Sequence, residues 1–299
     1  MTARTLLVTG GSGRLARGII EHLLDRGEDR IVTTTRSPEQ AADLAARGVE
    51  VRALDFDEDE TTIARALEGA DRMLLVSTHA VGRRPEQHGK VVRAAAAAGV
   101  GHLLYTSATS PAPTPLSPIV SDHFWTELAI FGGGMPWTIL RHNMYAEHLL
   151  LFLPAALEAC ELRTSLGDAA RAYVTRADCA AADAAALASR WTDHRIYDIG
   201  GPEALSIDDV LSIAEELTGR AVAHVRTTDE KALAAYIASG LPAGFPESAL
   251  GFDVWARGGH HAIVTSAVRD LTGQEPEAAR SYLTRKLDVL RTGRATVAE

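Results

Sequence analysis

Near its start the chain reads Leu7-Val8-Thr9-Gly10-Gly11-Ser12-Gly13-Arg14-Leu15-Ala16, where an apolar run meets closely spaced glycines and an amphipathic run follows at once. This order predicts a strand, a tight turn and a helix, which together point backbone N–H groups and a positive helix end at a phosphate. We expect Gly10 to make the turn, Gly13 to let the backbone approach a pyrophosphate, and Ala16 to keep helix and strand close. A plain turn is the alternative for so short a pattern. In this context the stretch predicts a dinucleotide site formed by Gly10, Gly11, Ser12, Gly13, Arg14 and Leu15.

Composition and charge exclude several other classes of protein. The 299 residues carry a formal net charge of −9 and contain no basic block, which argues against nucleic-acid binding. No apolar run approaches the roughly 20 residues of a membrane span, and no signal-peptide pattern precedes the first strand. The two cysteines, Cys160 and Cys179, lack metal-ligand or CxxC spacing, and we expect both to be reduced and buried. His260 and His261 are expected at the surface, so the sequence predicts a cytoplasmic protein without a metal site.

Strand-like and helix-like runs alternate through the first half of the chain. After the first strand and helix, strands are expected at 30–35, 49–54, 72–77, 101–107 and 137–141, and helices at 38–47, 61–67, 86–98 and 122–131. This alternation predicts an α/β fold, a Rossmann-type doubly wound parallel sheet. Later segments favour helices at 149–159, 177–189 and 206–219 and a strand at 195–199. We therefore expect an NAD(P)-binding domain over residues 1–148 and a smaller C-terminal substrate-binding lobe over 149–299, with segments that return to the sheet.

The end of the second strand indicates which dinucleotide is bound. An NAD site usually places Asp or Glu there to bind the ribose 2′-hydroxyl. Here the strand ends in Thr34-Thr35-Arg36-Ser37, with no carboxylate before Glu39. Arg36 offers a planar, bidentate donor for a 2′-phosphate, although a solvated surface arginine is the alternative. The pattern favours NADPH over NADH.

Polar residues also end the other expected strands. Asp55 and Phe56 follow the third strand, where an adenine would lie, and Ser77-Thr78 and Thr106-Ser107 close the fourth and fifth. Because ligands bind outside the carboxyl ends of parallel strands, Ser77, Thr78 and Ser107 are placed for ribose and nicotinamide. Each hydroxyl alone could equally cap a strand end.

The expected acid of a short-chain dehydrogenase is missing. Such an enzyme carries Tyr-x-x-x-Lys on the helix after the fifth strand, and the lysine lowers the tyrosine pKa. The matching helix here has His123 and Glu127 at i,i+4 spacing, where they could form an ion pair. His123 could instead polarise a substrate oxygen. The chemistry therefore needs less acid catalysis, or the protein is not a catalyst.

These motifs give the chain a resemblance to the NmrA-like, atypical short-chain dehydrogenase/reductase family, and within it to the type-2 NAD(P)H:quinone oxidoreductases. The resemblance spans nearly the whole chain and is carried by residues 10–15, 77–84, 87–88, 106–107, 123, 126–127, 139–147, 175–178 and 197–202. It implies that the glycine turn and Arg36 hold the pyrophosphate and 2′-phosphate. It also implies that the 141–147 loop, with Arg141, Asn143 and Tyr145, lies at the nicotinamide end. Two differences fall near that end: Leu128 replaces a frequent lysine, and His142-Asn143-Met144-Tyr145 replaces Asn-Gly-Trp-Tyr.

Hydride transfer is the function on which both lines of reasoning agree. A quinone needs little help from a protein acid, so the protein would mainly stack the acceptor against the nicotinamide and exclude water. Tyr145 is the first candidate for orienting the acceptor and His123 the second. Some of the aromatic residues Phe124, Trp125, Tyr145, Phe245 and Trp255 could line the pocket.

We therefore predict an NADPH-dependent oxidoreductase acting on a quinone-like or other conjugated small molecule, without nucleic-acid or membrane partners and with a homodimer as an open option. The alternatives are a redox sensor that binds NADP(H) without turnover, and a reductase of an imine or ketone biosynthetic intermediate.

Overall fold

A computed structural model of the chain describes residues 3–238 and 244–293, without the side chain of Phe245. Within these residues a seven-stranded parallel sheet has the order β3-β2-β1-β4-β5-β6-β9. The strands are β1 (Thr5–Thr9), β2 (Arg30–Thr35), β3 (Glu50–Ala53), β4 (Arg72–Leu75), β5 (His102–Ala108), β6 (Trp137–His142) and β9 (Arg195–Ile199). The strand order reverses at β1 and β4, so the predicted Rossmann-type α/β fold is confirmed.

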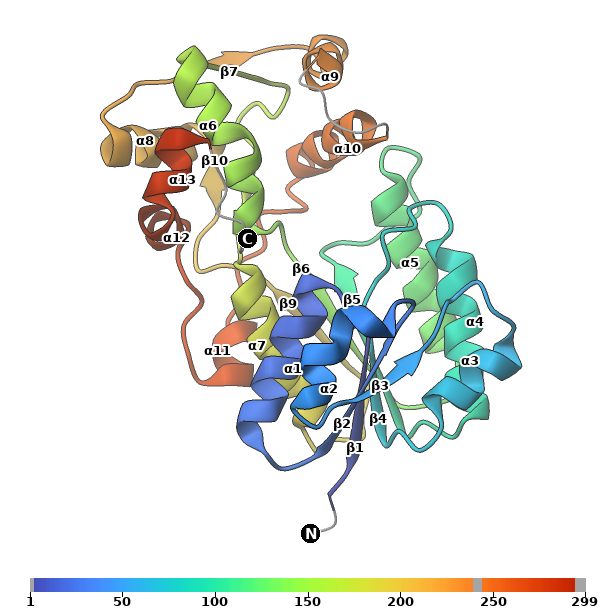
Figure 1. Cartoon of the computed structure of the whole chain (residues 1–299). Helices are drawn as coiled ribbons and strands as arrows, with labels where there is room; N and C mark the ends of the chain where they lie inside the picture. The colour runs from blue at the N-terminus through green and yellow to red at the C-terminus, as the bar shows by residue number, and fades with distance from the viewer. Residues whose placement is uncertain (1–2, 239–243, 294–299) are drawn as a thin grey trace.

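Helices cover both faces of this sheet (Figure 1). One face carries α1 (Arg14–Arg26), the η1 turn (Pro38–Ala41) with α2 (Ala42–Ala46), α7 (Arg176–Ala188) and α11 (Ala267–Thr272). The other carries α3 (Glu60–Leu67), α4 (Arg84–Ala97) and α5 (Pro118–Phe131). Successive residues of β1 serve the two layers in turn: Leu6 and Val8 join one apolar core, and Leu7 joins the other. The continuous apolar character of the strands follows from burial on both faces.

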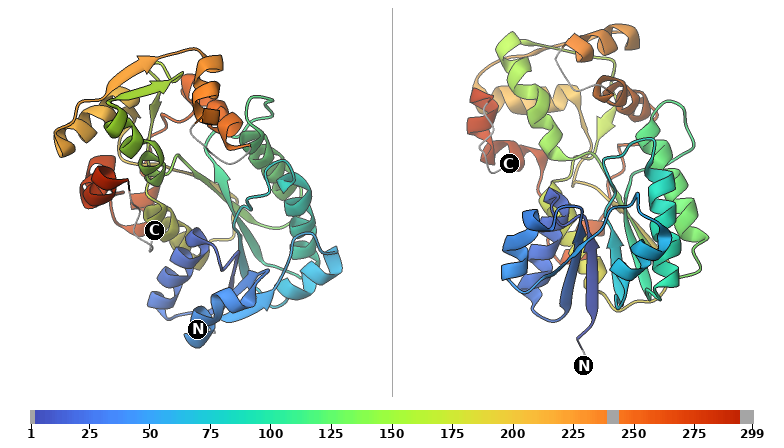
Figure 2. Two further views of the ribbon diagram at one scale, coloured as in Figure 1. Left: turned by 45° about the horizontal axis from the view of Figure 1, so that its top comes forward. Right: turned by 45° about the vertical axis from the view of Figure 1, so that its right-hand side comes forward.

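The remaining segments form a lobe above the carboxyl edge of the sheet (Figure 2). It contains the η2 turn (Ala146–His148), α6 (Leu149–Ala159), β7 (Glu161–Thr164), β8 (Ala170–Arg171), β10 (Leu205–Ser206), α8 (Ile207–Thr218), β11 (Ala223–Arg226), α9 (Asp229–Ala238), α10 (Phe245–Arg257), α12 (Ala279–Arg285) and α13 (Leu287–Thr292). This lobe has its own apolar core. Between its segments, α7 and β9 return to the sheet.

Local signals fix several element boundaries. The predicted capping box is present at the start of α8, where Ser206 and Asp209 bond each other's backbone N–H, and Gly219 ends the helix at φ 74°. α5 begins earlier than expected because Ser117 caps it and Pro118 occupies its first turn. Two expectations are wrong. Cys160 is exposed, because its left-handed backbone ends α6 at the surface, and His261 is buried, because the chain folds it under Phe252.

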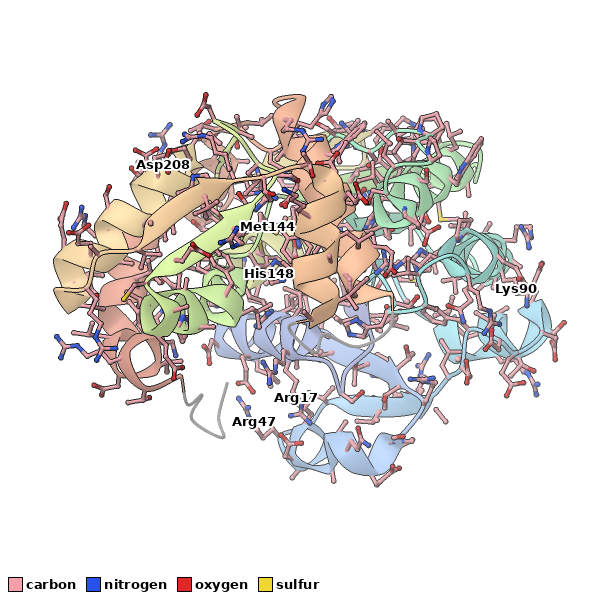
Figure 3. All side chains as sticks on the ribbon, turned by 90° about the horizontal axis from the view of Figure 1, so that it is seen from above. Arg17, Arg47, Lys90, Met144, His148 and Asp208 are labelled. Carbon is pink, nitrogen blue, oxygen red and sulfur yellow. The ribbon has the colours of Figure 1, made fainter. Side chains whose placement is uncertain are left out.

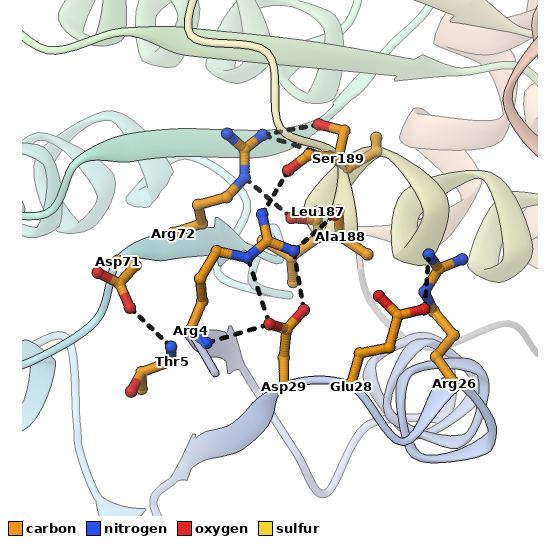
Figure 4. A network of polar contacts seen from close by, with 11 residues as sticks. Arg4, Thr5, Arg26, Glu28, Asp29, Asp71, Arg72, Leu187, Ala188 and Ser189 are labelled. Atoms are coloured by element: carbon orange, nitrogen blue, oxygen red, sulfur yellow. Dashed lines mark hydrogen bonds and ion pairs between the residues drawn. The ribbon is translucent and has the colours of Figure 1, made fainter. Parts of the chain in front are cut away.

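Two arginines hold the C-terminal end of α7 at the amino edge of the sheet (Figure 4). Arg4 pairs with Asp29 and donates to the carbonyls of Ala188 and Ser189. Arg72 on β4 donates to the carbonyls of Ala186, Leu187 and Trp191, and burial lowers its pKa to about 10. The last carbonyls of a helix favour cations, so this clamp fixes α7 against the sheet. Among the residues described, no helix is long and apolar enough to cross a membrane.

Candidate functional site

The glycine turn after β1 is folded tightly onto the end of β2. The Gly10 and Gly11 N–H groups both donate to the Thr34 carbonyl, at 2.8 and 3.0 Å, and Gly10 has φ 75°. A Cβ at Gly11 would lie 2.3 Å from Thr33 Oγ1. The turn therefore needs Gly10 for its conformation and Gly11 for the close approach of β2, a packing role that the motif alone did not reveal.

The N-terminal end of α1 is open towards a ligand. Gly13 precedes the helix with no side-chain cap, and the first turn contains no acidic residue. The Gly13 N–H donates back to the Gly10 carbonyl at 2.7 Å, whereas Ser12 and Arg14 are exposed. Uncapped N–H groups, a positive helix end and no nearby carboxylate in the first turn fit the pyrophosphate of a dinucleotide.

The end of β2 contacts this turn. Thr35 Oγ1 lies 3.1 Å from Ser12 Oγ, so the next residue, Arg36, emerges beside the turn. Arg36 is exposed and makes no ion pair with any residue in the described ranges. The arrangement fits a 2′-phosphate, and that assignment of Arg36 remains a prediction.

The two residues after the third strand, Asp55 and Phe56, already contact other residues of the protein. Asp55 Oδ1 accepts the Asp57 N–H at 3.0 Å, which shapes the turn that follows. Phe56 is buried in the core between β2 and α4, with its ring edge-on to His88 at 6.3 Å. Contact of Asp55 and Phe56 with an adenine also remains a prediction.

The ends of β4 and β5 are tied to each other and to α4. The Ser77 N–H donates to Thr106 Oγ1 at 2.9 Å, and Thr78 Oγ1 lies 3.2 Å from Gln87 Oε1. Arg84 Nε donates to the Thr78 carbonyl at 2.6 Å. These contacts fix the backbone at the edge where we expect ribose and nicotinamide, while Ser77 stays half-buried.

Glu127 on α5 connects the ends of β5 and β6. Ser107 Oγ donates to it at 2.7 Å, and Arg141 donates to both of its oxygens, at 3.0 and 2.7 Å. The expected ion pair between His123 and Glu127 is wrong, because the strand ends supply better partners than the helix itself. Ser107 and Arg141 were predicted to bind the cofactor, and both side chains are held by Glu127.

His123 is buried and faces β5. Its Nδ1 lies 2.7 Å from the Tyr105 hydroxyl, and burial lowers the pKa of His123 well below its usual value. Burial also raises the pKa of Tyr105, so the phenol keeps its proton. The imidazole is therefore neutral at pH 7, with one of its two nitrogens protonated. It can take part in hydrogen bonds but cannot act as a cation.

The loop after β6 carries Asn143 and Tyr145. The Asn143 amide donates to the His261 carbonyl at 3.1 Å and accepts the Met144 N–H at 2.8 Å, so this side chain fastens the loop to the segment before α11. The Tyr145 ring is half-buried, with the Arg176 guanidinium 5.3 Å from its centroid. Met144 and His148 project from the same loop (Figure 3), with 2.9 Å between Met144 Sδ and His148 Nδ1.

One polar pair at this loop was missed by sequence reasoning. His142 Nε2 lies 2.9 Å from Asp183 Oδ1 on α7, and His142 Nδ1 lies 3.0 Å from the Tyr145 hydroxyl. The unusual histidine within 142–145 was the visible signal, but its partner lies 41 positions along the chain. The structure thus joins Tyr145 to a buried carboxyl.

The aromatic residues expected to line a pocket lie in different surroundings, and their contact with an acceptor remains a prediction. Trp125 is 50 % exposed on α5, and the Trp255 ring stacks on His260 at 4.0 Å. The Phe245 side chain lies outside the described residues. No cluster of metal-ligating side chains occurs within residues 3–238 and 244–293.

The chain is similar to proteins of known class. It is 33 % identical to quinone oxidoreductase 2 of Escherichia coli K12 over 255 residues, which is 85 % of this chain and 88 % of that protein. The structure of the NADPH-dependent quinone oxidoreductase of Escherichia coli with NADPH superposes with a TM-score of 0.89 at 30 % identity, covering 94 % of this chain and 99 % of that one. An NmrA-like oxidoreductase of Aspergillus flavus is 31 % identical over 223 residues, 72 % of each chain.

A further structural match, the Citrobacter triphenylmethane reductase with NADP(H), has a TM-score of 0.86 at 26 % identity and covers 94 % of this chain and 99 % of that one. Residues 10–190 match the family described as NAD(P)H-binding. The predicted NmrA-like resemblance and the class of NAD(P)H-dependent oxidoreductase are confirmed. The chain belongs to the NAD(P)H-binding family.

Proposed function

We propose that this protein is an NADPH-dependent reductase of a quinone or a similarly conjugated small molecule. The observation that carries the proposal is the open N-terminal end of α1, beside which Arg36 forms no ion pair with any described residue, together with the lack of a carboxylate at the end of β2. When bound, the reduced nicotinamide supplies a hydride. Two similar proteins are named as a quinone oxidoreductase and a triphenylmethane reductase. Quinones and triphenylmethane compounds both spread the incoming charge over a conjugated system.

The protein's own residues would position the cofactor and the acceptor and exclude water from between them. The turn at residues 10–15 would hold the pyrophosphate and Arg36 the 2′-phosphate, while the ends of β4, β5 and β6 would support the ribose and nicotinamide. Tyr145 would orient the acceptor. The neutral His123 fits a hydrogen-bonding role better than that of a strong acid, which agrees with an acceptor that needs little acid catalysis.

Replacing Arg36 tests the cofactor assignment. In Arg36→Ala we expect NADPH to bind roughly 10- to 100-fold more weakly, because charge-assisted hydrogen bonds to the 2′-phosphate are lost, and NADH binding to be unchanged. Cofactor fluorescence measures both dissociation constants without turnover. The matched control is Arg93→Ala, an exposed arginine paired with Glu60 on α3. Equal losses for the two cofactors, or no loss, would contradict the assignment.

A cofactor-binding regulator is the second candidate. It is favoured by Glu127, a carboxylate that binds both Ser107 and Arg141 where the lysine of a Tyr-x-x-x-Lys pair would stand. NADPH oxidation with simple quinones supports the reductase. Tight NADPH binding with no turnover across quinone, azo and triphenylmethane acceptors supports the regulator.

We also propose a cytoplasmic homodimer. Unpaired cysteines are typical of a reducing compartment. The exposed apolar residues Trp125, Leu128 and Phe131 lie at helical spacing on α5 and would suit a self-association surface. Sedimentation velocity on the wild type and on Trp125→Glu decides between monomer and dimer.

A further inference from the structure

The array Asp183–His142–Tyr145 is built from three separate elements. His142 is the last residue of β6, Asp183 lies in the middle of α7, and Tyr145 follows β6 at the start of the η2 turn. The His142 backbone is fixed by its register with Ile199 of β9, and α7 is clamped by Arg4 and Arg72. His142 and Asp183 are therefore held by a strand and a helix, and Tyr145 is held in the loop after β6 by a backbone bridge to Val174.

Asp183 is the most deeply buried member of this array. It is 0 % exposed, and burial raises the pKa of its carboxyl while His142 opposes that rise. Its Oδ2 makes no hydrogen bond with any described residue. A carboxylate so desolvated stabilises a positive charge on its one partner, the His142 imidazole.

The contact with Asp183 also sets the proton positions on His142. Asp183 accepts the Nε2 proton, so Nδ1 faces the Tyr145 hydroxyl. In the neutral imidazole, Tyr145 donates its hydrogen bond to Nδ1. In the imidazolium, Nδ1–H donates to the Tyr145 oxygen, and the phenol proton is free to point elsewhere.

Other ionisable groups surround the array on every side. Burial raises the pKa of Tyr145, so its hydroxyl stays protonated at neutral pH. The surrounding groups are Glu147 and His148 on the η2 turn, Arg176, Asp178 and Cys179 on α7, and His123 on α5. Of the array's members, only the half-buried Tyr145 reaches towards the surface, because His142 and Asp183 are buried.

We infer that Asp183, His142 and Tyr145 form a proton relay that delivers a proton to the oxygen of the acceptor, an inference that rests on the proposed function. The proposed reaction supplies the electron pair and one hydrogen as hydride, and the relay supplies the one proton that completes the reduction. The Tyr145 O–H bond breaks as the acceptor oxygen gains a proton, and Tyr145 takes the Nδ1 proton of the His142 imidazolium. His142 becomes neutral, and solvent restores its proton after the product leaves. Tyr145 is the catalytic residue, whereas His142 and Asp183 act through it.

A double-mutant cycle tests the relay. We expect Tyr145→Phe to lower kcat with a simple quinone roughly 100-fold, and His142→Asn and Asp183→Asn roughly 10- to 100-fold, with the KM for NADPH unchanged. In the Tyr145→Phe background, His142→Asn should not lower kcat further, because the Tyr145 hydroxyl to which His142 passes its proton is absent. A merely structural role for His142 would instead lower kcat in both backgrounds. The matched control is His102→Gln, a buried histidine on β5 bonded only to Thr138 among the described residues.

A readout without turnover completes the test. The nitrogen-15 shifts of His142 report which ring nitrogen holds the proton. At pH 8 we expect the proton on Nε2 in the wild type and a mixture of tautomers in Asp183→Asn, with NADPH affinity unchanged in both. An identical His142 spectrum in the two proteins, or additive losses in the cycle, contradicts the relay. A wild type that oxidises no NADPH contradicts the proposed function instead, and the spectra still decide the His142–Asp183 coupling.

Discussion

Arg141 and His142 are neighbours on β6, yet their side chains build two different buried arrays on opposite faces of the sheet. Arg141 reaches α5, where it donates two hydrogen bonds to Glu127, and the Ser107 hydroxyl donates a third to the same carboxylate. His142 reaches α7, where Asp183 binds one ring nitrogen and leaves one oxygen unpaired. The alternation of a strand explains the divergence.

This difference between the two arrays indicates which of them can transfer a proton. In the Glu127 array a permanent cation faces a carboxylate whose two oxygens both accept hydrogen bonds, which holds the array in place. In the Asp183 array every member can gain or lose a proton. The first array is therefore expected to contribute stability, and the second to contribute reactivity at some cost in stability.

The largest effect is expected from Arg141→Met. It leaves the buried Glu127 carboxylate with only the Ser107 hydroxyl, so the free energy of unfolding should fall by about 3 kcal/mol. Urea denaturation measures this. The exposed Arg93–Glu60 pair provides the control, since Arg93→Met should change stability little. A loss no greater than the control's would mean that the first array is not structural.

Asp183→Ala should destabilise the protein less, by about 1–2 kcal/mol. The change leaves His142 Nε2 without its acceptor, but it also removes a buried carboxyl with an unpaired oxygen. The same denaturation experiment compares the two variants directly. If Asp183→Ala cost as much as Arg141→Met, the contrast between the arrays would be lost.

Ser107→Ala should lower the free energy of unfolding by only about 1 kcal/mol, because Glu127 keeps both hydrogen bonds from Arg141. In a protein that already carries Arg141→Met, Ser107→Ala should lower the free energy of unfolding only slightly further, since both changes act on one carboxylate. Thermal unfolding of the two single variants and the double variant measures the coupling. Fully additive losses would show that Ser107 and Arg141 act independently of Glu127.

The smallest effect concerns pH. Burial raises the pKa of Asp183 above its unfolded value, so the folded state binds this proton more tightly. The resulting stability is present below the unfolded pKa and is lost as pH rises through the folded pKa. Relative to Asp183→Asn, the wild type should therefore lose stability as pH rises from about 4. Melting temperatures of both proteins across pH 4 to 8 measure the difference, and parallel curves would contradict it.

Short-range patterns allowed much of the fold to be predicted from sequence. Strand β2 at Arg30–Thr35, helix α6 at Leu149–Ala159 and strand β9 at Arg195–Ile199 have the expected bounds, because apolar runs and helix periodicity are local properties. The left-handed Gly10 and the capping box at Ser206 are also local. The missing carboxylate at the end of β2 was likewise readable, since it depends on a single strand end.

The partners of polar side chains could not be predicted in the same way. Spacing on one helix suggested that Glu127 pairs with His123, but the fold brings Arg141 and Ser107 to Glu127 and Tyr105 to His123. Asn143 is still predicted to lie at the nicotinamide end, and its contact with His261, 118 positions along the chain, could not be read from the sequence.

The sequence by itself determined the glycine turn, the alternation of strands and helices, and the family to which the chain belongs, because each is written in adjacent residues. Only the tertiary structure decided that Arg141 and His142 would serve opposite faces, and that Asp183 would meet His142. The physical reason is that burial removes water as a partner, so a polar side chain pairs with whichever group the packing of distant elements places within reach.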